Sequence, residues 1–256
     1  MPSSPPIALT RAVSPSIDRC ELIHLAREPI DAGRAQRQHE AYERALEACG
    51  CTVHRLPVAP ELPDAVFVED AAVVVDEVAV MTRPGAASRR GEVESVAEAL
   101  IRWRSLAWIR PPATLDGGDV LRVGRSVWVG LSSRTGLEGL DQLNRVLEPH
   151  GYSVRGVQVS GCLHLKTAVT DLSDGLLLVN PAWVDPAELG LDVVEVDPNE
   201  PYAANALRIG ARVVYPEAFQ RTAARIEGRG VELVRVDVSE LAKAEGGVTC
   251  CSILVR

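Results

Sequence analysis

The sequence lacks any run of about 18 consecutive apolar residues, the length that a membrane-spanning helix needs. Its first residues, MPSSPPIALTRAV, lack the apolar core of a secretory signal peptide. No Pro-, Ser- or Gly-rich linker and no low-complexity tract interrupts the chain, so we expect one domain over residues 1–256. These absences predict a cytoplasmic protein with no membrane partner.

An excess of positive charge is also lacking. The 27 Lys and Arg residues are outnumbered by 35 Asp and Glu, and the formal net charge of -8 argues against a nucleic acid partner. The six cysteines form no framework typical of small secreted domains, and Cys49-Gly50-Cys51 lacks the C-x-x-C spacing of zinc and redox sites. We therefore expect reduced thiols and no metal site.

What the sequence does contain is a recurring unit headed by a polar residue. Asp70, Asp119, His164, Asn205 and Cys250 each open a short Val/Ile/Leu-rich run, and subtraction of their positions gives intervals of 49, 45, 41 and 45. In all but the last unit a polar turn and a second apolar run follow, which predicts a β-hairpin. Such a nearly constant period is typical of repeated supersecondary units.

Three of the hairpins are followed by a helical pattern and then by another strand. The predicted helices lie within residues 91–106, 135–151 and 219–230, and the strands within 106–112, 153–159 and 231–238. A strand-strand-helix-strand unit repeated about five times buries its sheets only by closing on itself. The fold class that we predict is α/β, as a five-bladed propeller with pseudosymmetry.

The fifth unit is split between the two ends of the chain. Its strand follows Cys250 and the sequence stops at Arg256, so the unit lacks its remaining parts there. A strand within residues 6–13 and a helix within residues 27–50 supply them. We therefore expect the N- and C-terminal segments to complete one blade together.

Three carboxylates stand close together in the otherwise apolar segment 63–70. Burial of Asp64, Glu69 and Asp70 is costly unless a positive group lies between them, which predicts a cationic ligand. The alternative is that they cap turns and bond loop amides. Asp116 and Asp119 flank two glycines and are open to the same alternative, a turn with solvated aspartates.

Two further side chains have catalytic potential. His164 lies among apolar neighbours and is either a satisfied core residue or an acid–base group. Cys250 follows Gly246 and Gly247, where a backbone can approach a ligand closely. Together with the carboxylates they offer a nucleophile, a base and cation-binding acids.

Two arginines end the second strand of their units just before a helix. Arg89 and Arg134 therefore occupy corresponding positions in two units and should converge in space. Paired guanidinium groups suit a carboxylate, although each could instead be a helix-cap or surface residue. A substrate with a cation at one end and a carboxylate at the other resembles arginine.

The segments PDAVFVED, TRPGAASRRGE, LDGGDVL, GLSSRT, LHLKT, YAAN and GGVTCCS resemble the dimethylarginine dimethylaminohydrolases of the pentein superfamily, from about residue 60 onward. The resemblance implies a fivefold pseudosymmetric α/β propeller that hydrolyses Nω-methylated arginines to citrulline. The reaction would pass through a covalent cysteine intermediate and require no metal or organic cofactor. A homodimer is left open.

The resemblance also implies a role for individual residues. Cys250 would be the nucleophile, His164 the general acid and base, and Asp116 the carboxylate that orients the imidazole. The implied substrate-binding residues are Asp64, Glu69, Asp70, Arg89 and Arg134, with the backbone carbonyls of Leu22, in an N-terminal lid over 13–24, and of Ala244. Asp70 would hold the guanidinium nitrogens, Asp64 the α-amino end, and the two arginines the α-carboxylate.

Departures and alternatives accompany this prediction. Asp116 stands where some members carry Glu. Cys251 follows Cys250 directly, and because successive side chains on a strand point to opposite faces, only one can reach the site. We expect Cys250 to be that residue, and Cys251 to be packing or a redox- or metal-linked modulator. A deiminase of free arginine and a non-catalytic binding pentein are the alternative functions.

Overall fold

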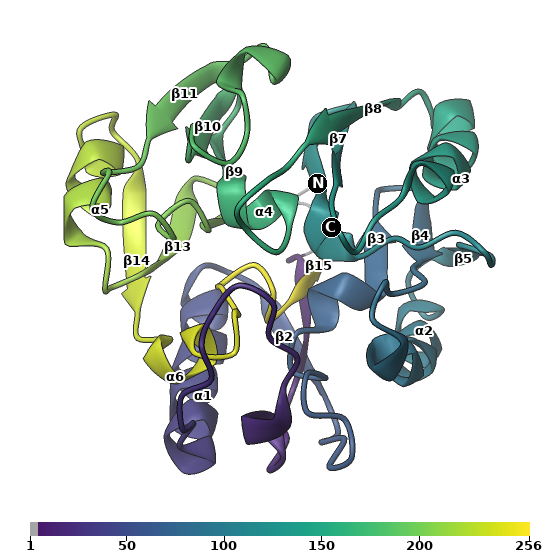
Figure 1. Ribbon diagram of the computed structural model, residues 1–256, viewed down its shortest axis with the longest axis horizontal. Coiled ribbons are helices and arrows are strands. Elements are labelled where there is room, and N and C mark those ends of the chain that lie inside the picture. The colour runs from purple at the N-terminus through teal and green to yellow at the C-terminus, as the bar shows by residue number, and fades with distance from the viewer. Residues whose placement is uncertain (1–4) are drawn as a thin grey trace.

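The described part of the computed structural model, residues 5–256, contains five three-stranded sheets arranged around a common centre like the blades of a propeller (Figure 1). In every sheet two strands pair antiparallel and the middle strand pairs parallel with the third. The predicted α/β propeller is confirmed. Residues 1–4 of the expected 1–256 domain lie outside the described residues.

Four blades are continuous in the sequence. The first comprises β3 (Ala72–Val74), β4 (Val78–Met81), α2 (Val93–Leu100) and β5 (Ser105–Trp108). The second comprises β6 (Val120–Val123), β7 (Ser126–Leu131), α3 (Leu137–Leu147) and β8 (Ser153–Gln158). The third comprises β9 (Val169–Ser173), β10 (Leu176–Val179) and β11 (Asp192–Glu195). The fourth comprises β12 (Leu207–Ile209), β13 (Arg212–Pro216), α5 (Gln220–Glu227) and β14 (Glu232–Val236).

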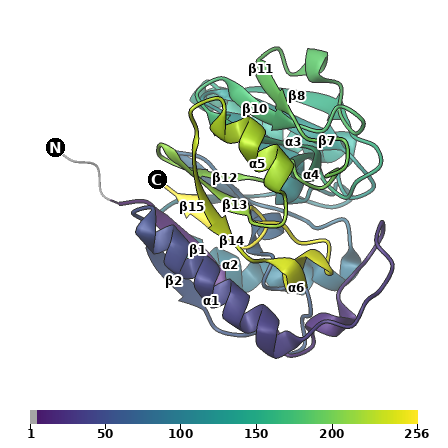
Figure 2. The same cartoon turned by 90° about the vertical axis from the view of Figure 1, so that its left-hand side faces the viewer.

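The fifth blade brings together strands from opposite ends of the sequence. Its sheet has the order β15 (Ile253–Val255), β1 (Ile7–Arg11) and β2 (Thr52–Leu56), and α1 (Ala32–Ala48) connects the last two. Leu9 pairs with Ile253 on one side and with His54 on the other. Figure 2 shows β15 beside β1, with α1 running along the outside of the blade.

The helices form where apolar residues recur at helical spacing and pack against a sheet. In α2 the side chains of Val93, Val96, Ala97 and Leu100 are buried at the spacing of one helix face. The helix α1 begins at Ala32, inside the predicted range of 27–50. Asp31 caps it by accepting a hydrogen bond from the Arg34 N–H, at 2.9 Å.

The third unit differs from its predicted form. Residues Leu165–Ala168 form the short helix α4, and the first strand of the blade starts only at Val169. The N–H of Leu165 donates to Asp119 Oδ1, at 2.9 Å, which holds the start of α4 beside the preceding blade. The strand β11 is a further difference, because the predicted strands do not include residues 192–195.

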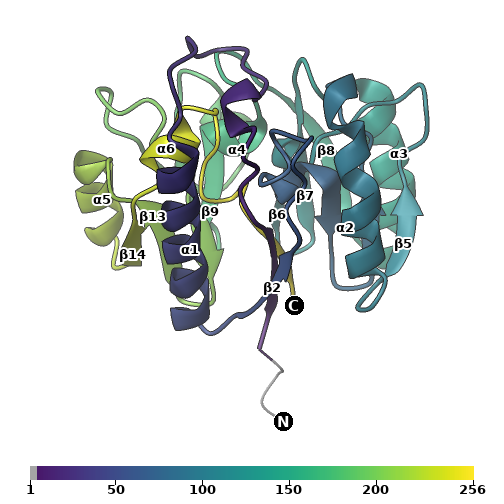
Figure 3. The same cartoon turned by 90° about the horizontal axis from the view of Figure 1, so that it is seen from below.

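Three of the polar residues that head the repeats lie in turns before the strands, rather than at the first strand position. Asp70 and Asp119 lie in 3₁₀ turns, over Val68–Ala71 and Gly117–Asp119, and Cys250 lies in a turn before β15. Residues 12–31, which we call the N-terminal segment, lie at the same end of the molecule as α4 and as α6 (Ser239–Ala242) (Figure 3). This end carries the candidate site.

Within residues 5–256, no helix combines the length and the apolar character needed to cross a membrane.

Candidate active site

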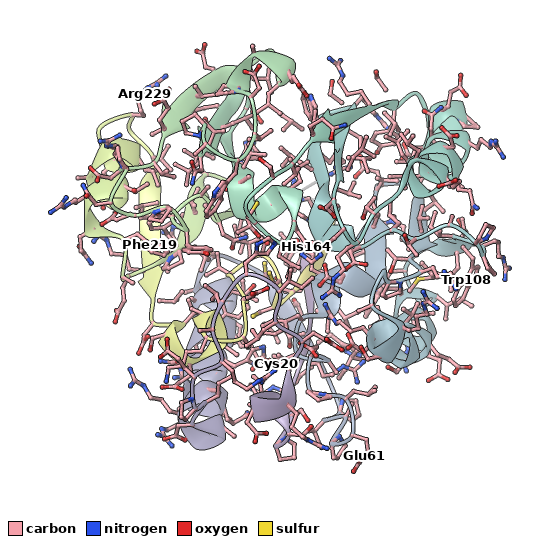
Figure 4. The ribbon with its side chains drawn as sticks, in the orientation of Figure 1. Cys20, Glu61, Trp108, His164, Phe219 and Arg229 are labelled. Carbon is pink, nitrogen blue, oxygen red and sulfur yellow. The ribbon has the colours of Figure 1, made fainter. Side chains whose placement is uncertain are left out.

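A small pocket lies where the turns of the blades meet, and Figure 4 shows His164 near the centre of the molecule. The lining residues are Glu21, Asp64, Phe67, Asp70, Arg89, Arg134, Leu163, His164, Ala244, Glu245, Gly246 and Cys250. The enclosed space is about 20 Å³, room for about one water molecule. The fold therefore gathers most of the predicted site residues, which lie far apart in the sequence.

His164 is held between two carboxylates. Its Nε2 lies 3.0 Å from Asp116 Oδ2, and its Nδ1 lies 3.8 Å from Asp70 Oδ1. Burial by itself lowers the pKa of His164, but the charges of Asp70 and Asp119 and the bond to Asp116 outweigh it and raise that pKa to about 9. The imidazole is thus a cation at neutral pH and can donate a proton.

Asp116 and Asp119 are fixed by backbone and hydroxyl donors. Asp116 Oδ1 accepts from the Gly85 N–H at 2.8 Å, which orients the carboxylate toward His164. Asp119 accepts from Leu165 N and Ser132 Oγ, and burial raises the pKa of its carboxyl to about 6. Asp119 thus supports the turn that carries His164, whereas Asp116 contacts the imidazole itself.

Three of these groups could also surround a metal ion. Candidate ligand atoms of Asp70, Asp116 and His164 all lie within 4.8 Å of one another. The sequence spacing predicted no such set, because the three residues come from three separate turns. The positive charge on His164 at neutral pH balances part of the carboxylate charge in this cluster.

Asp70 is an ionised carboxylate bonded on two sides. The Gly118 N–H donates to Oδ1 at 2.9 Å, and Arg89 Nη1 donates to Oδ2 at 2.5 Å. Burial raises the pKa of Asp70, but His164 and Arg89 outweigh this effect and lower it to about 2. Arg89 also pairs with Glu92, so both carboxylate partners of its guanidinium come from the protein.

The guanidinium group of Arg134 has fewer protein partners than that of Arg89. Its side chain is buried, and Nη1 has no hydrogen-bond partner among the described residues. The nearest carboxylate oxygen recorded for it is Asp116 Oδ2, at 3.9 Å. Buried donors normally have partners, so the free Nη1 suits a ligand oxygen.

Cys250 is a half-buried thiol at the rim of the cluster. Its Sγ accepts from the Gly247 N–H at 3.3 Å and lies 4.0 Å from Thr249 Oγ1. Burial, together with Glu69 and Asp70, raises the pKa of the thiol to about 12. Cys251 is fully buried with its Sγ 3.5 Å from the Gly247 carbonyl oxygen, and it does not line the pocket.

The structure does not bring the Glu69 side chain into this pocket. Its carboxylate accepts from Lys166 Nζ at 2.6 Å and from Thr249 Oγ1 at 2.7 Å, and it lines a separate cavity of about 190 Å³. The Glu69 N–H donates to the carbonyl oxygen of Cys250 at 3.1 Å. Glu69 therefore contacts the residues around the thiol from behind the pocket.

Asn205 reinforces the same region. Its Oδ1 accepts from the Thr249 N–H at 3.0 Å, and its Nδ2 donates to Thr249 Oγ1 and to the carbonyl oxygen of Lys166. One amide thus joins the turn of the nucleophile to α4, which follows His164.

The N-terminal segment covers the pocket. The Glu21 N–H donates to both oxygens of Asp64, at 3.1 and 3.3 Å. Ala244 lines the pocket, whereas Leu22 is half-buried and is not among the lining residues. The placement of Asp64 and Ala244 agrees with a substrate-binding shell, and Leu22 lies next to it.

Sequence reasoning missed Glu245, which fastens this segment. Its Oε1 accepts from three successive backbone N–H groups, those of Ile23, His24 and Leu25, at 3.0, 2.6 and 2.6 Å. Glu245 also has a φ of 57°, in the left-handed region that non-glycine residues rarely adopt. The only sequence signal was an acid directly before Gly246 and Gly247.

Comparisons with a family model and with named proteins point to the same family. A family model described as "N,N dimethylarginine dimethylhydrolase, eukaryotic" matches residues 23–184, more than half of the chain. A Streptomyces coelicolor protein named N(G),N(G)-dimethylarginine dimethylaminohydrolase is 42% identical over 250 residues, covering 97% of this chain and 96% of that protein. The Pseudomonas aeruginosa protein of the same name is 38% identical over 226 residues, covering 87% and 89%.

Solved structures extend the similarity to the whole fold. The Pseudomonas aeruginosa protein, a cysteine-to-serine mutant complexed with citrulline, has a TM-score of 0.92 at 34% identity, covering 97% of this chain and 98% of that one. The N-terminal domain of the cyanobacterial arginine dihydrolase ArgZ has a TM-score of 0.85 at 19% identity, with 98% of each chain covered, and shares the fold. The chain belongs to the dimethylarginine dimethylaminohydrolase family.

Proposed function

We propose that the protein hydrolyses Nω-methylated arginines, asymmetric dimethylarginine and monomethylarginine, to citrulline plus dimethylamine or methylamine. The observation that carries the proposal is the imidazole of His164, bonded to Asp116 in a pocket that Cys250 also lines. Cys250 acts as nucleophile, His164 as general acid and then base, and Asp116 orients the imidazole. The reaction requires no metal or organic cofactor.

The binding roles follow the charges around the pocket. Asp70, with its pKa lowered to about 2, binds the guanidinium group, and Asp64 receives the α-amino end together with the carbonyl oxygens of Leu22 and Ala244. Arg134 binds the α-carboxylate through its unpartnered Nη1.

Two of the predicted binding residues, Arg89 and Glu69, support the site through other protein groups rather than by free contact with the substrate. Arg89 fixes Asp70 and reaches a substrate carboxylate only by exchanging a protein partner. Glu69 positions the turn of the nucleophile, because its carboxylate accepts a hydrogen bond from Thr249 and its N–H donates to the carbonyl oxygen of Cys250.

The first half-reaction breaks the bond to the methylated nitrogen. The Cys250 sulfur forms a bond to the guanidinium carbon, and the electron pair of the C=N bond moves onto nitrogen. His164 gives its proton to the methylated nitrogen, the C–N bond breaks, and the amine leaves. An S-alkylthiouronium group then joins the substrate to Cys250.

The second half-reaction consumes one water molecule. Neutral His164 takes a proton from water as the water oxygen attacks the same carbon. The C–S bond then breaks and the remaining hydroxyl proton passes through solvent to the released amine, which leaves citrulline and restores the Cys250 thiolate and the protonated imidazole. The atoms of one substrate and one water are thus divided between citrulline and the amine.

The substrate itself activates the thiol. Without a ligand, burial and the charges of Glu69 and Asp70 keep the pKa of Cys250 at about 12. A guanidinium cation bound at Asp70 offsets those charges and favours the thiolate. Ionisation of the nucleophile is thereby linked to the presence of a cationic substrate.

A parallel assay of citrulline formation from asymmetric dimethylarginine, monomethylarginine and arginine tests the proposal. We expect the methylated substrates to have the higher kcat/KM. Faster turnover of arginine would identify a deiminase of free arginine. If no substrate reacts but one of them binds in calorimetry, the protein is a binding module.

We also propose that the protein acts on this small molecule in the cytoplasm, without nucleic acid, in keeping with its net charge of -8. A homodimer belongs to the same proposal. Cell fractionation and sedimentation of the purified protein test the two points.

A further inference from the structure

A second, larger cavity adjoins the pocket of Cys250. It encloses about 230 Å³. Apolar side chains supply much of its wall: Leu25, Leu163, Tyr202, Phe219, Val238 and Ala242. We call this cavity the apolar chamber. Phe219 lies further from the centre of the molecule than His164, so the chamber extends outward from the catalytic residues (Figure 4).

The chamber and the pocket share a wall at the reacting groups. Leu163, Glu245 and Gly246 line both spaces. Leu163 directly precedes His164, and Gly247, also in the chamber wall, donates its N–H to Cys250 Sγ at 3.3 Å. The chamber thus adjoins the proposed acid through Leu163 and the proposed nucleophile through Gly247.

The pocket and the chamber differ in the charged side chains that line them. Asp64, Asp70, Arg89 and Arg134 all line the pocket, and none of them lines the chamber. In the chamber wall, the Asp237 carboxylate is bonded to Arg34 and to Ser239. The charged ends of an amino acid therefore belong in the pocket, and an apolar group belongs in the chamber.

Glu245 holds part of the chamber wall in place. His24 and Leu25 line the chamber, and the Glu245 carboxylate accepts hydrogen bonds from both of their backbone N–H groups at 2.6 Å. The chamber wall is thus held by a charge-assisted contact rather than by loose packing.

We propose that the apolar chamber receives the alkyl substituent on the nitrogen that leaves as an amine. This inference rests on the proposed function. An alkylated nitrogen has fewer N–H groups for Asp70, so the unsubstituted nitrogen faces Asp70 and the alkylated one faces His164 and the shared wall. The space of about 230 Å³ takes groups larger than two methyls, so the substrate class extends to arginines with longer N-alkyl chains.

The size of the effect follows from burial. Each methylene that enters an apolar site contributes a factor of about four in binding. NG-ethyl- and NG-propyl-L-arginine should therefore reach a kcat/KM within about tenfold of that for the monomethyl compound, or above it, even though their longer chains must be ordered.

Thr167 offers a matched pair of variants. It lines the chamber but not the pocket, and no side-chain hydrogen bond of Thr167 is recorded among the described residues. Thr167→Leu adds bulk to the chamber, whereas Thr167→Val keeps the shape and removes only the hydroxyl. Ala242→Phe, at an exposed position that also lines the chamber, obstructs the chamber without changing the core.

The test is the kcat/KM for monomethyl-, ethyl- and propylarginine with the wild type and these variants. We expect Thr167→Leu or Ala242→Phe to lower the value for propylarginine at least tenfold more than the value for the monomethyl substrate. Thr167→Val should leave the ratio between the two substrates unchanged. Rejection of propylarginine by the wild type by more than a hundredfold, or equal losses for both substrates, overturns the inference.

A second measurement separates this inference from the proposed function. N-methyl- and N-propyl-chloroacetamidine alkylate a thiol by forming a C–S bond with loss of chloride, so mass spectrometry of modified Cys250 needs no turnover. If no methylated arginine gives citrulline, the proposed function fails. The chamber inference still stands if the propyl reagent reacts as fast as the methyl reagent and Thr167→Leu slows only the propyl one, and it fails otherwise.

Discussion

At the scale of single residues, the two neighbouring cysteines differ in position although not in chemistry. Cys250 lines the pocket, and Cys251 is fully buried behind it. We expect Cys250→Ser to lower kcat at least about 10³-fold, because a hydroxyl is a much weaker nucleophile than a thiolate. Cys251→Ser should keep activity within about tenfold.

Citrulline assays and mass spectrometry of the acid-quenched enzyme measure these effects. The thiouronium adduct should appear on the peptide with Cys250 in the wild type and in Cys251→Ser. Full activity of Cys250→Ser, with loss in Cys251→Ser, would reverse the assignment.

The protonation states of His164 and Cys250 predict the pH dependence. The reactive form has a protonated imidazole and a thiolate, whereas the pKa values of about 9 for His164 and about 12 for Cys250 favour a protonated imidazole and a thiol at neutral pH. Raising the pH increases the thiolate fraction until His164 begins to lose its proton. The value of kcat/KM should therefore rise about tenfold per pH unit between pH 6 and 8, and level off near pH 9.

The pH dependence of the Asp116→Asn variant follows from the same pKa shift of His164. Removal of that carboxylate takes away one of the groups that raise the pKa of His164, so the point of levelling should move to lower pH. A profile of kcat/KM for both proteins checks the shift. An unchanged levelling point in Asp116→Asn would mean that Asp116 does not act on the imidazole.

The sequence contained enough to predict which residue types face the pocket, because motifs and repeat spacing both point to them. It could not predict their pairings. Arg89 is bound to Asp70 and Glu92, and the Glu69 carboxylate faces another cavity. Such contacts depend on the orientations of side chains from separate turns, on which the spacing of residues carries no information.

At the scale of elements, residues 23–25 of the N-terminal segment are held by the single carboxylate of Glu245. The pocket has room for about one water molecule, so this segment must move to admit an arginine. Glu245→Gln replaces three charge-assisted hydrogen bonds at residues 23–25 with neutral ones. We expect KM to rise about fivefold with little change in kcat, since such a charge contributes about 1 kcal/mol.

Hydrogen exchange at residues 23–25 provides a direct measurement, and it should accelerate in Glu245→Gln. Glu28→Gln is the matched control, because it removes an exposed charge from the same segment. Equal changes in the two variants would indicate an effect of net charge alone.

The elements themselves were predictable to the extent that their patterns are regular. The hairpins of the first, second and fourth blades and their helices follow the alternation and helical spacing of apolar residues. The third blade was not predicted correctly. Residues 165–168 were expected to begin a strand, but they form α4, whose first N–H, that of Leu165, donates to Asp119. A contact from another blade overrides local preference there.

At the scale of the whole molecule, the ring is closed by β1, the middle strand of its sheet. Leu9 is completely buried and pairs with strands on both sides. Leu9→Ala leaves a cavity that the surrounding strands cannot fill, so we expect a loss of about 3 kcal/mol in the free energy of unfolding.

Urea denaturation measures this loss. Val58→Ala, at a side chain that is 43% exposed, serves as the control and should change stability by less than about 0.5 kcal/mol. Equal stability of the two variants would mean that β1 contributes little to closure of the ring.

The pairing of β15 with β1 also sets an order of events during translation. Cys250 and β15 follow all other described strands in the sequence, so a growing chain can form four blades before its thiol leaves the ribosome. Until then one edge of β1 is unpaired and open to chaperones or to aggregation. The same few residues supply both the missing strand and the nucleophile, and a nascent chain therefore becomes reactive only as its ring closes.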